Sequence, residues 1–227
     1  MMIDFFGSSP HRTPDERAHA INTHPGAFSD DYMSFGYDYF DNPNIGVGYG
    51  GYHYDGRYAQ PVADMIEYYE LVPGDRVLEL GCAKGYALVE FAKRGMDVVG
   101  VDGSAYAKEN AHPDVMNRIL RRDFLDQLPF EEGAFDLVFA KDVLAHVARQ
   151  VLVAILGEFR EVSKGALWFD IVCSDTRRER TQLGRWDGTF KTLRSQAYWA
   201  RLMDGINADY NLKHLVDPTW LKKTASA

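Results

Sequence analysis

The chain has 227 residues, of which 46% are hydrophobic and 26% are charged, a composition typical of a globular protein with one substantial core. Asp and Glu outnumber Lys and Arg by 33 to 25, so the formal net charge is −8, which argues against a protein that binds nucleic-acid phosphates over a broad surface. No apolar run reaches the length of about eighteen residues that a membrane span requires, and the first residues lack the basic and apolar pattern of a secretion signal.

The first 60 residues are expected to lie outside the main fold. Residues 1–27 combine proline with polar residues, which predicts an irregular arm. Residues 28–58, which we call the aromatic cap, interleave Phe and Tyr with glycine. Such a segment can turn tightly and close over a ligand to exclude water, or it can pack its rings on the outside of a sheet. The rings expected to close over a ligand are those of Tyr49, Tyr52, His53 and Tyr54.

A helix is predicted to open at Pro61, and a strand rich in Val and Leu follows at 76–80. The next helix covers 86–94. Between that strand and helix the chain reads Glu79-x-Gly81-x-Ala83-x-Gly85. The two glycines allow a sharp turn and the close approach of a ligand, and the free N–H groups at the start of the helix point toward it.

Two classes of nucleotide ligand use such a turn, dinucleotides and S-adenosylmethionine. A dinucleotide fingerprint starting at Gly81 requires glycine at positions 83 and 86, where this chain has Ala83 and Tyr86. An NAD-dependent oxidoreductase is therefore disfavoured.

Further strands are predicted at 97–101, 118–121, 135–140 and 166–172, with a helix at 149–162. This alternation predicts a parallel sheet that is covered by helices on both faces and binds its ligand over the carboxyl ends of the strands. Asp102 ends one of these strands, where a carboxylate can accept hydrogen bonds from both hydroxyls of a ribose.

The last elements are a helix capped by Ser195 and a strand at 210–216. Six strands are recognisable, and 189–193 is a candidate for one more. The main domain is placed at 61–217, and 218–227 is expected to be a tail.

The motif at 79–85 resembles motif I of the class I S-adenosylmethionine-dependent methyltransferases, with Ala83 where that family usually has its middle glycine. The resemblance continues in order over about 71–172. It implies an α/β fold, a Rossmann-like three-layer sandwich with a mostly parallel six- or seven-stranded sheet, whose last two strands are usually antiparallel. The implied cofactor is S-adenosyl-L-methionine, and the product is S-adenosyl-L-homocysteine. Residues matching the family's cofactor site are Glu79, Gly81, Cys82, Ala83, Gly85, Asp102, Gly103, Asp123, Phe124 and Lys141.

Methyl transfer to an alcohol requires alignment of the reactants and removal of the hydroxyl proton. His146 is the first candidate base and Asp142 the second, and the two share a side if their segment is helical. Structural packing of His146, and capping or cofactor contact by Asp142, remain alternatives. Weaker candidates are His53, Tyr54 and Asp170. A magnesium site of Asp142, Asp170 and Asp175 is chemically sensible, but no ligand spacing supports it, so no metal is predicted.

Two segments are candidates for acceptor binding. The run from Tyr49 to Arg57 resembles a segment ahead of motif I in some bacterial members of the family. This resemblance indicates Tyr52, Tyr54 and Arg57 as acceptor-binding residues. Arginines also cluster after the strand at 166–172, and Arg177 and Arg178 could hold a phosphate or carboxylate unless they are merely solvated.

The sequence therefore predicts methyl transfer to a small and possibly anionic molecule, directed at oxygen in a sugar, nucleotide-linked sugar or natural-product intermediate, with neither a nucleic-acid nor a membrane partner. A protein or RNA methyltransferase and a non-catalytic cofactor-binding protein are the alternatives. Cys82 and Cys173 form no CxxC pair, which favours a cytoplasmic protein with reduced thiols. Whether the protein is a monomer or a homodimer stays open.

Overall fold

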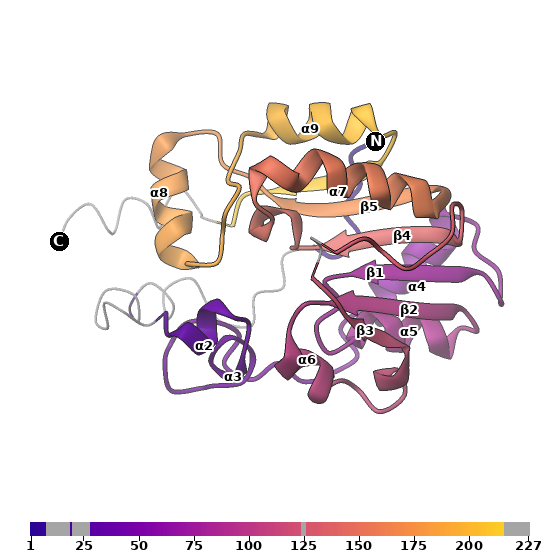
Figure 1. Ribbon diagram of the computed structural model, residues 1–227, viewed down its shortest axis with the longest axis horizontal. Helices are drawn as coiled ribbons and strands as arrows, with labels where there is room; N and C mark the ends of the chain where they lie inside the picture. The colour runs from indigo at the N-terminus through magenta and orange to yellow at the C-terminus, as the bar shows by residue number, and fades with distance from the viewer. Residues whose placement is uncertain (8–18, 20–27, 124–125, 216–227) are drawn as a thin grey trace.

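The computed structural model describes residues 1–7, 19, 28–123 and 126–215 of the chain. Within them the chain builds one sheet of six strands in the order β3-β2-β1-β4-β5-β6 (Figure 1). All neighbouring strands are parallel. The strands are β1 (Arg76–Leu80), β2 (Asp97–Asp102), β3 (Ile119–Arg121), β4 (Phe135–Lys141), β5 (Ser163–Val172) and β6 (Asp209–Lys213).

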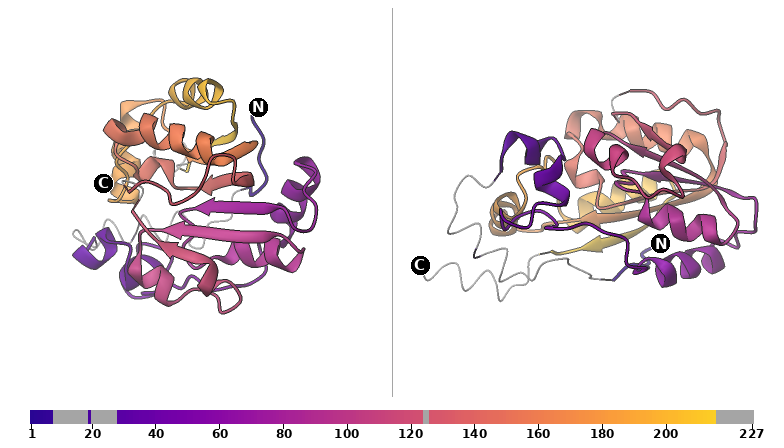
Figure 2. Two further views of the ribbon diagram at one scale, coloured as in Figure 1. Left: turned by 45° about the vertical axis from the view of Figure 1, so that its right-hand side comes forward. Right: turned by 90° about the horizontal axis from the view of Figure 1, so that it is seen from below.

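Helices cover both faces of this sheet, as the views in Figure 2 show. The α-helices are α2 (Asp30–Met33), α3 (Tyr37–Phe40), α4 (Ala59–Tyr68), α5 (Tyr86–Lys93), α6 (Ala105–Glu109), α7 (Arg149–Val162), α8 (Arg177–Trp186) and α9 (Gln196–Gly205). Two 3-10 turns, η1 (Met116–Arg118) and η2 (Leu144–His146), lie between them.

The core consists of two apolar layers separated by the sheet. In β4, Leu137 and Phe139 pack with α4 and α5, whereas Val138 and Ala140 pack with α7 and α9. Successive side chains of a strand point to opposite faces, so a strand buried on both faces is apolar throughout. This explains why the strands of this domain could be recognised as continuous apolar runs.

The predicted α/β sandwich and most of its element bounds are confirmed. The helix at 149–162 is α7. Ser195 caps α9 by accepting a hydrogen bond from the N–H of Tyr198.

At the end of the chain one candidate is corrected and two features are added. Residues 189–193 form no strand. The last strand, β6, runs parallel to β5, because α9 crosses over between them and a crossover connection returns the chain in the same direction. The arginine cluster after β5 lies on the helix α8, which opens with a capping box formed by Thr176 and Glu179.

The first residues of the predicted irregular arm lie along the edge of the sheet. The N–H of Ile3 donates to the carbonyl of Tyr210 in β6 at 2.8 Å. Phe5 and Phe6 pack on the ring of Trp168, with centroids 5.5 and 5.3 Å away. The remainder of the arm, residue 19 apart, and the expected tail at 218–227 lie outside the described residues.

Cys82 and Cys173 are both buried and free of disulfides. Across the described segments, no helix combines the length and the apolar character needed to cross a membrane.

Candidate active site

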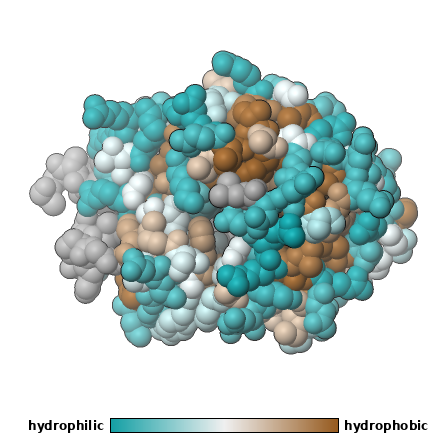
Figure 3. Space-filling model, viewed as in Figure 1, coloured by the Kyte–Doolittle hydropathy of each residue, from teal (hydrophilic) through white to brown (hydrophobic). Residues whose placement is uncertain are grey.

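The carboxyl ends of the strands meet at one edge of the sheet, and two segments flank that edge. The α2–α3 segment lies on one side of it and α8 on the other (Figure 1). The space-filling view shows a hollow near the centre of the molecule, beside the α2–α3 segment and these strand ends (Figure 3). Ligands of parallel α/β sheets bind at this position.

The turn after β1 has the backbone that its glycines allow. Gly81 and Gly85 have φ angles of +69° and +77°, and a Cβ on Gly81 would lie 2.2 Å from Cγ2 of Val143. Ala83, where the family has glycine, also takes a left-handed φ of +48°. The N–H of Gly81 donates to the carbonyl of Val101 at 2.7 Å, which ties the turn to β2.

Asp102 fastens this turn to the loop after β2. One carboxylate oxygen accepts the N–H of Ala83 at 2.7 Å, and the other accepts the N–H of Ser104 at 2.8 Å. Burial raises the pKa of Asp102, and these two hydrogen bonds oppose the rise. Each oxygen retains acceptor capacity for a ribose hydroxyl.

Glu79 is the last residue but one of β1 and is only 6% exposed. Its Oε2 atom has no hydrogen-bond partner among the described residues. Burial, together with repulsion from Asp102, raises the pKa of Glu79 well above its ordinary value. A buried polar atom without a protein partner at the ligand-binding edge is expected of a group that meets a ligand.

Lysines surround the acids at the ends of β4 and β5. The Nζ atom of Lys213, in β6, lies 2.6 Å from Oδ1 of Asp142 and 2.5 Å from Oδ2 of Asp170. Lys141 forms a second ion pair with Asp142. Burial opposes ionisation of Asp142, but the charges of Lys141 and Lys213 outweigh it and hold the pKa of Asp142 below its ordinary value.

This pairing bears on two sequence-based hypotheses. Asp142 is an anion held by two cations, which makes it a weak base. It also has a left-handed φ of +61° and precedes η2, so no continuous helix places it beside His146 as the spacing suggested. Asp175 lies 3.3 Å from His214 instead of joining Asp142 and Asp170. The described part of the chain gathers no group of three candidate metal ligands.

His146 closes η2 with its ring between two aromatic side chains. The ring centroids of Phe35, in the aromatic cap, and Phe190 lie 5.6 and 4.8 Å away. Its Nδ1 atom lies 2.8 Å from the hydroxyl oxygen of Thr189. Burial lowers the pKa of His146 below its ordinary value of 6.5, with a smaller opposing effect from Asp187, so the imidazole is neutral at neutral pH.

The aromatic cap packs directly on the glycine turn. Its rings form one cluster with Ala83 and Tyr86. Lys84, in the turn, is buried and donates to Oδ2 of Asp41 at 2.6 Å and to the carbonyl of Tyr52 at 2.9 Å. The hydroxyl of Ser104 donates to the carbonyl of Phe35 at 2.6 Å. Sequence reasoning did not select Lys84, Asp41 or Lys213, because each acquires its role from a partner far away in the chain.

The candidate acceptor residues of the aromatic cap each contact a residue of the cap or of α5. Tyr52 is buried in the cap, with its hydroxyl 3.2 Å from that of Tyr58. Tyr54 donates to Glu90 on α5. Arg57 forms an ion pair with Asp55.

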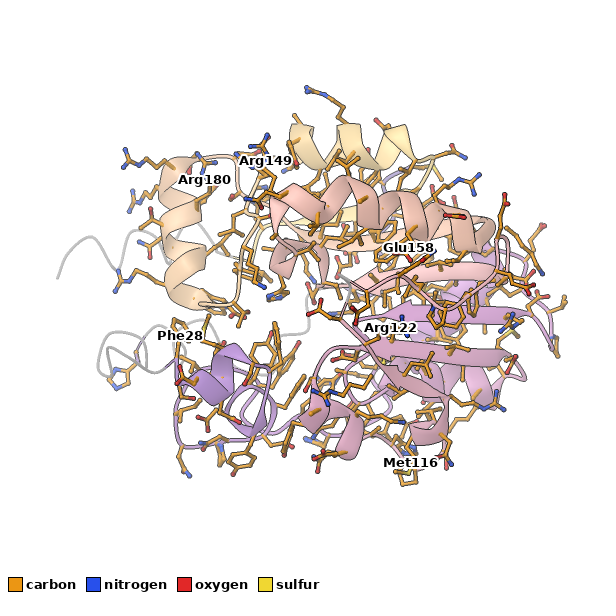
Figure 4. The ribbon with its side chains drawn as sticks, in the orientation of Figure 1. Phe28, Met116, Arg122, Arg149, Glu158 and Arg180 are labelled. Carbon is orange, nitrogen blue, oxygen red and sulfur yellow. The ribbon has the colours of Figure 1, made fainter. Side chains whose placement is uncertain are left out.

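Four of the other predicted residues are exposed. Arg177 and Arg178 are exposed in the first turn of α8. Figure 4 labels Arg180 on α8 and Arg149 at the start of α7. Gly103 and Asp123 are also exposed, and Phe124 lies outside the described residues.

Comparison with known proteins identifies the domain. A family model described as "Methyltransferase domain" matches residues 77–165, which contain the turn, Asp102, Asp142 and His146. These residues form a class I S-adenosylmethionine-dependent methyltransferase domain. The cofactor of this family is S-adenosylmethionine.

Three relatives match over part of their length. An uncharacterized methyltransferase of Synechocystis is 34% identical over 47% of this chain and 50% of that protein. Magnesium-protoporphyrin O-methyltransferase of Rhodobacter capsulatus is 32% identical over 43% of this chain and 45% of its own. The 23S rRNA (uracil(1939)-C(5))-methyltransferase RlmD of Enterobacter is 31% identical over 42% of this chain and 26% of that protein. This chain thus spans half or less of these proteins.

Solved structures share the fold. The YcgJ protein of Bacillus subtilis superposes with a TM-score of 0.54 at 18% identity, over 73% of this chain and 77% of that one. A second structure is geranyl diphosphate C-methyltransferase of Streptomyces coelicolor, solved with Mg²⁺, geranyl diphosphate and S-adenosyl-L-homocysteine. It superposes with a TM-score of 0.51 at 17% identity, over 66% of each chain.

Proposed function

We propose that this protein transfers the methyl group of S-adenosylmethionine to a hydroxyl oxygen of a small molecule. When bound, the cofactor supplies a methyl group on a positively charged sulfur, and the electron pair of the broken carbon–sulfur bond stays on sulfur. The residues fit such a ligand, because Glu79 offers a buried carboxyl oxygen without a protein partner and Asp102 presents fixed acceptors at the end of β2.

The observation that carries the proposal is the neutral imidazole of His146 beneath the aromatic cap. As the acceptor oxygen attacks the methyl carbon, its proton passes to His146, which acts as general base. Contact of the ring with Phe35 places the base under the cap, where aromatic side chains exclude water. Asp142 is a poorer candidate because Lys141 and Lys213 hold its charge.

Oxygen as the attacking atom is further supported by a relative, since magnesium-protoporphyrin O-methyltransferase is by name an O-methyltransferase. We retain a sugar, a nucleotide-linked sugar or a natural-product intermediate as the acceptor class. An anionic acceptor would find Arg177 and Arg178 exposed on α8, at one flank of the strand ends. We also retain the cytoplasm as the compartment in which the reaction occurs.

RNA methylation is the second candidate function. It is favoured by the similarity to RlmD, which modifies 23S rRNA, and by the basic surface of α8. The net charge of −8 opposes it, because RNA binding depends on counterion release from a basic surface.

A methyl-transfer assay with the full chain separates these functions. Radiolabelled S-adenosylmethionine is supplied with phenols, sugars and nucleotide sugars in one series and with total RNA in another. We expect label only in the first series, on oxygen. Label confined to RNA, or to nitrogen or carbon of a small molecule, would contradict the proposal.

With the acceptor found in this way, His146→Ala should slow transfer by roughly 10² to 10⁴-fold, the usual contribution of a general base, and leave affinity for S-adenosylhomocysteine nearly intact. His112→Ala is a matched control, because His112 also packs against aromatic rings but lies against Tyr54 and Tyr86. Full activity of His146→Ala would exclude the base assignment.

A further inference from the structure

His146 is joined to a buried carboxylate through one hydroxyl group. The Thr189 hydroxyl lies 2.8 Å from Nδ1 of His146 and donates to Oδ1 of Asp187 at 2.6 Å. The N–H of Thr189 donates to the same carboxylate oxygen at 3.0 Å. Thr189 and Asp187 are only 2% and 5% exposed, so this chain of hydrogen bonds is shielded from water.

The available protons determine the direction of each bond. A carboxylate oxygen can only accept, so the single hydroxyl proton of Thr189 points to Asp187. The hydroxyl oxygen must then accept a hydrogen bond, and Nδ1 of His146 is its donor. A neutral imidazole with its proton on Nδ1 carries the free electron pair on Nε2. The ring contacts the Thr189 hydroxyl through Nδ1 and not through Nε2.

The segment that carries these groups is fixed to the base. The N–H groups of Lys191 and Thr192 both donate to the carbonyl of Ala145 at 2.9 Å, beside His146. Phe190, between them and Thr189, packs on the imidazole ring. From the aromatic cap, the hydroxyl of Tyr39 reaches the second oxygen of Asp187 at 3.4 Å. The connection between α8 and α9 therefore holds the orientation of His146.

We propose that Thr189 and Asp187 are positioning residues, which keep the proton of neutral His146 on Nδ1 and leave Nε2 to accept the proton of the acceptor hydroxyl. This inference rests on the proposed function of His146. The acceptor proton moves to Nε2, the oxygen keeps the electron pair with which it bonds to the methyl carbon, and the imidazolium charge is balanced by Asp187 across the Thr189 hydroxyl. No proton passes to Asp187, as in other histidine–carboxylate pairs.

Nitrogen-15 NMR of the full chain without ligand tests the proton position directly. The signals of His146 are assigned by their absence in His146→Ala. We expect a protonated Nδ1 and an unprotonated Nε2 in the neutral wild-type ring. Thr189→Val should move part of the population to the Nε2-protonated form, whereas Thr189→Ser, which keeps the hydroxyl, should resemble the wild type.

Thr192→Val is the matched control. Thr192 is also 2% exposed and lies in the same connection, but its hydroxyl donates to the carbonyl of Val147. This variant loses a buried hydrogen bond without touching the ring of His146, so we expect wild-type nitrogen signals. A wild-type ring protonated on Nε2, or a Thr189→Val ring identical to the wild type, would overturn the proposal.

Asp187→Asn keeps an acceptor for the Thr189 hydroxyl but removes the negative charge. The charged groups that act on His146 are Asp187 and Asp142, which raise its pKa, and Lys191, which lowers it. We therefore expect a His146 pKa below that of the wild type in an NMR titration, and an unchanged value would count against the proposal. If Thr189→Val does not fold, Asp187→Asn still tests the proposal through the pKa of His146.

Once an acceptor is known, Thr189→Val should lower kcat by about 10²-fold with little change in KM, the size expected for a misplaced catalytic group, and Thr189→Ser should restore it. An unchanged kcat contradicts the inference. The NMR results need no acceptor, so a protein that shows the expected ring but no methyl transfer would refute the proposed function and leave the hydrogen-bond assignment standing.

Discussion

Asp102 illustrates how one side chain prepares a site before the ligand arrives. Its two oxygens already hold the N–H groups of Ala83 and Ser104, one in each of the loops that flank the expected nucleoside. A ribose that binds there meets acceptors whose positions are fixed, which reduces the ordering that binding requires.

We therefore expect Asp102→Ala to weaken binding of S-adenosylhomocysteine by roughly 1.5 to 3 kcal/mol, the range for hydrogen bonds to a charged group. Isothermal titration calorimetry measures this loss. Asp97→Ala, at the amino end of the same strand, is the control and should bind as the wild type does. Equal affinities of Asp102→Ala and the wild type would remove Asp102 from the cofactor site.

The pH dependence of methyl transfer should report the environment of His146. Burial lowers its pKa below 6.5, so the imidazole stays unprotonated to a lower pH than an exposed histidine would. Because the base works only when unprotonated, the rate should stay level below pH 6.5 and fall as the pH drops through the lowered pKa. A kcat profile with an acidic limb at or above pH 6.5 would disagree with this environment.

Among the elements, those with a local signal could be predicted and those made by distant partners could not. The helical periodicity of 149–162 predicts α7, and separate apolar runs between 76 and 172 predict the strands β1 to β5. The capping box of α8 is also a local signal in the sequence. The helix was not predicted, because its many arginines leave only Leu183 and Trp186 as buried apolar positions. By contrast, the ion pair of Lys213 with Asp142 depends on a parallel β6, and the bond of Thr189 to His146 spans 43 positions.

The connection between the aromatic cap and the glycine turn can be tested through the ion pair of Lys84, which is 6% exposed, with Asp41, which is 21% exposed. Lys84→Met removes a charged hydrogen bond, so it should lower the free energy of unfolding by about 2 kcal/mol. Urea denaturation measures it. Lys164→Met removes the exposed pair with Asp136 and should cost less than about 1 kcal/mol. Similar losses in the two variants would show that the Lys84 pair contributes no more than a surface contact.

At the scale of the whole molecule, the site is a consequence of topology. Because all six described strands are parallel, Glu79, Asp102 and Lys141 are delivered to one edge from three separate strands. This convergence could be predicted from the alternation of strands and helices along the chain. The position of the aromatic cap over that edge could not be predicted, because the cap has no periodicity and is held by ring packing and by Lys84.

We infer that this edge of the sheet binds an adenosine whose sulfur end faces His146. A crystal structure of the full chain with S-adenosylhomocysteine would show this binding mode. We expect the ribose hydroxyls to bond to the carboxylate of Asp102, and the sulfur to lie above the Gly81 turn on the side of His146. A nucleoside bound elsewhere, or bound here with its ribose turned away from Asp102, would refute this binding mode.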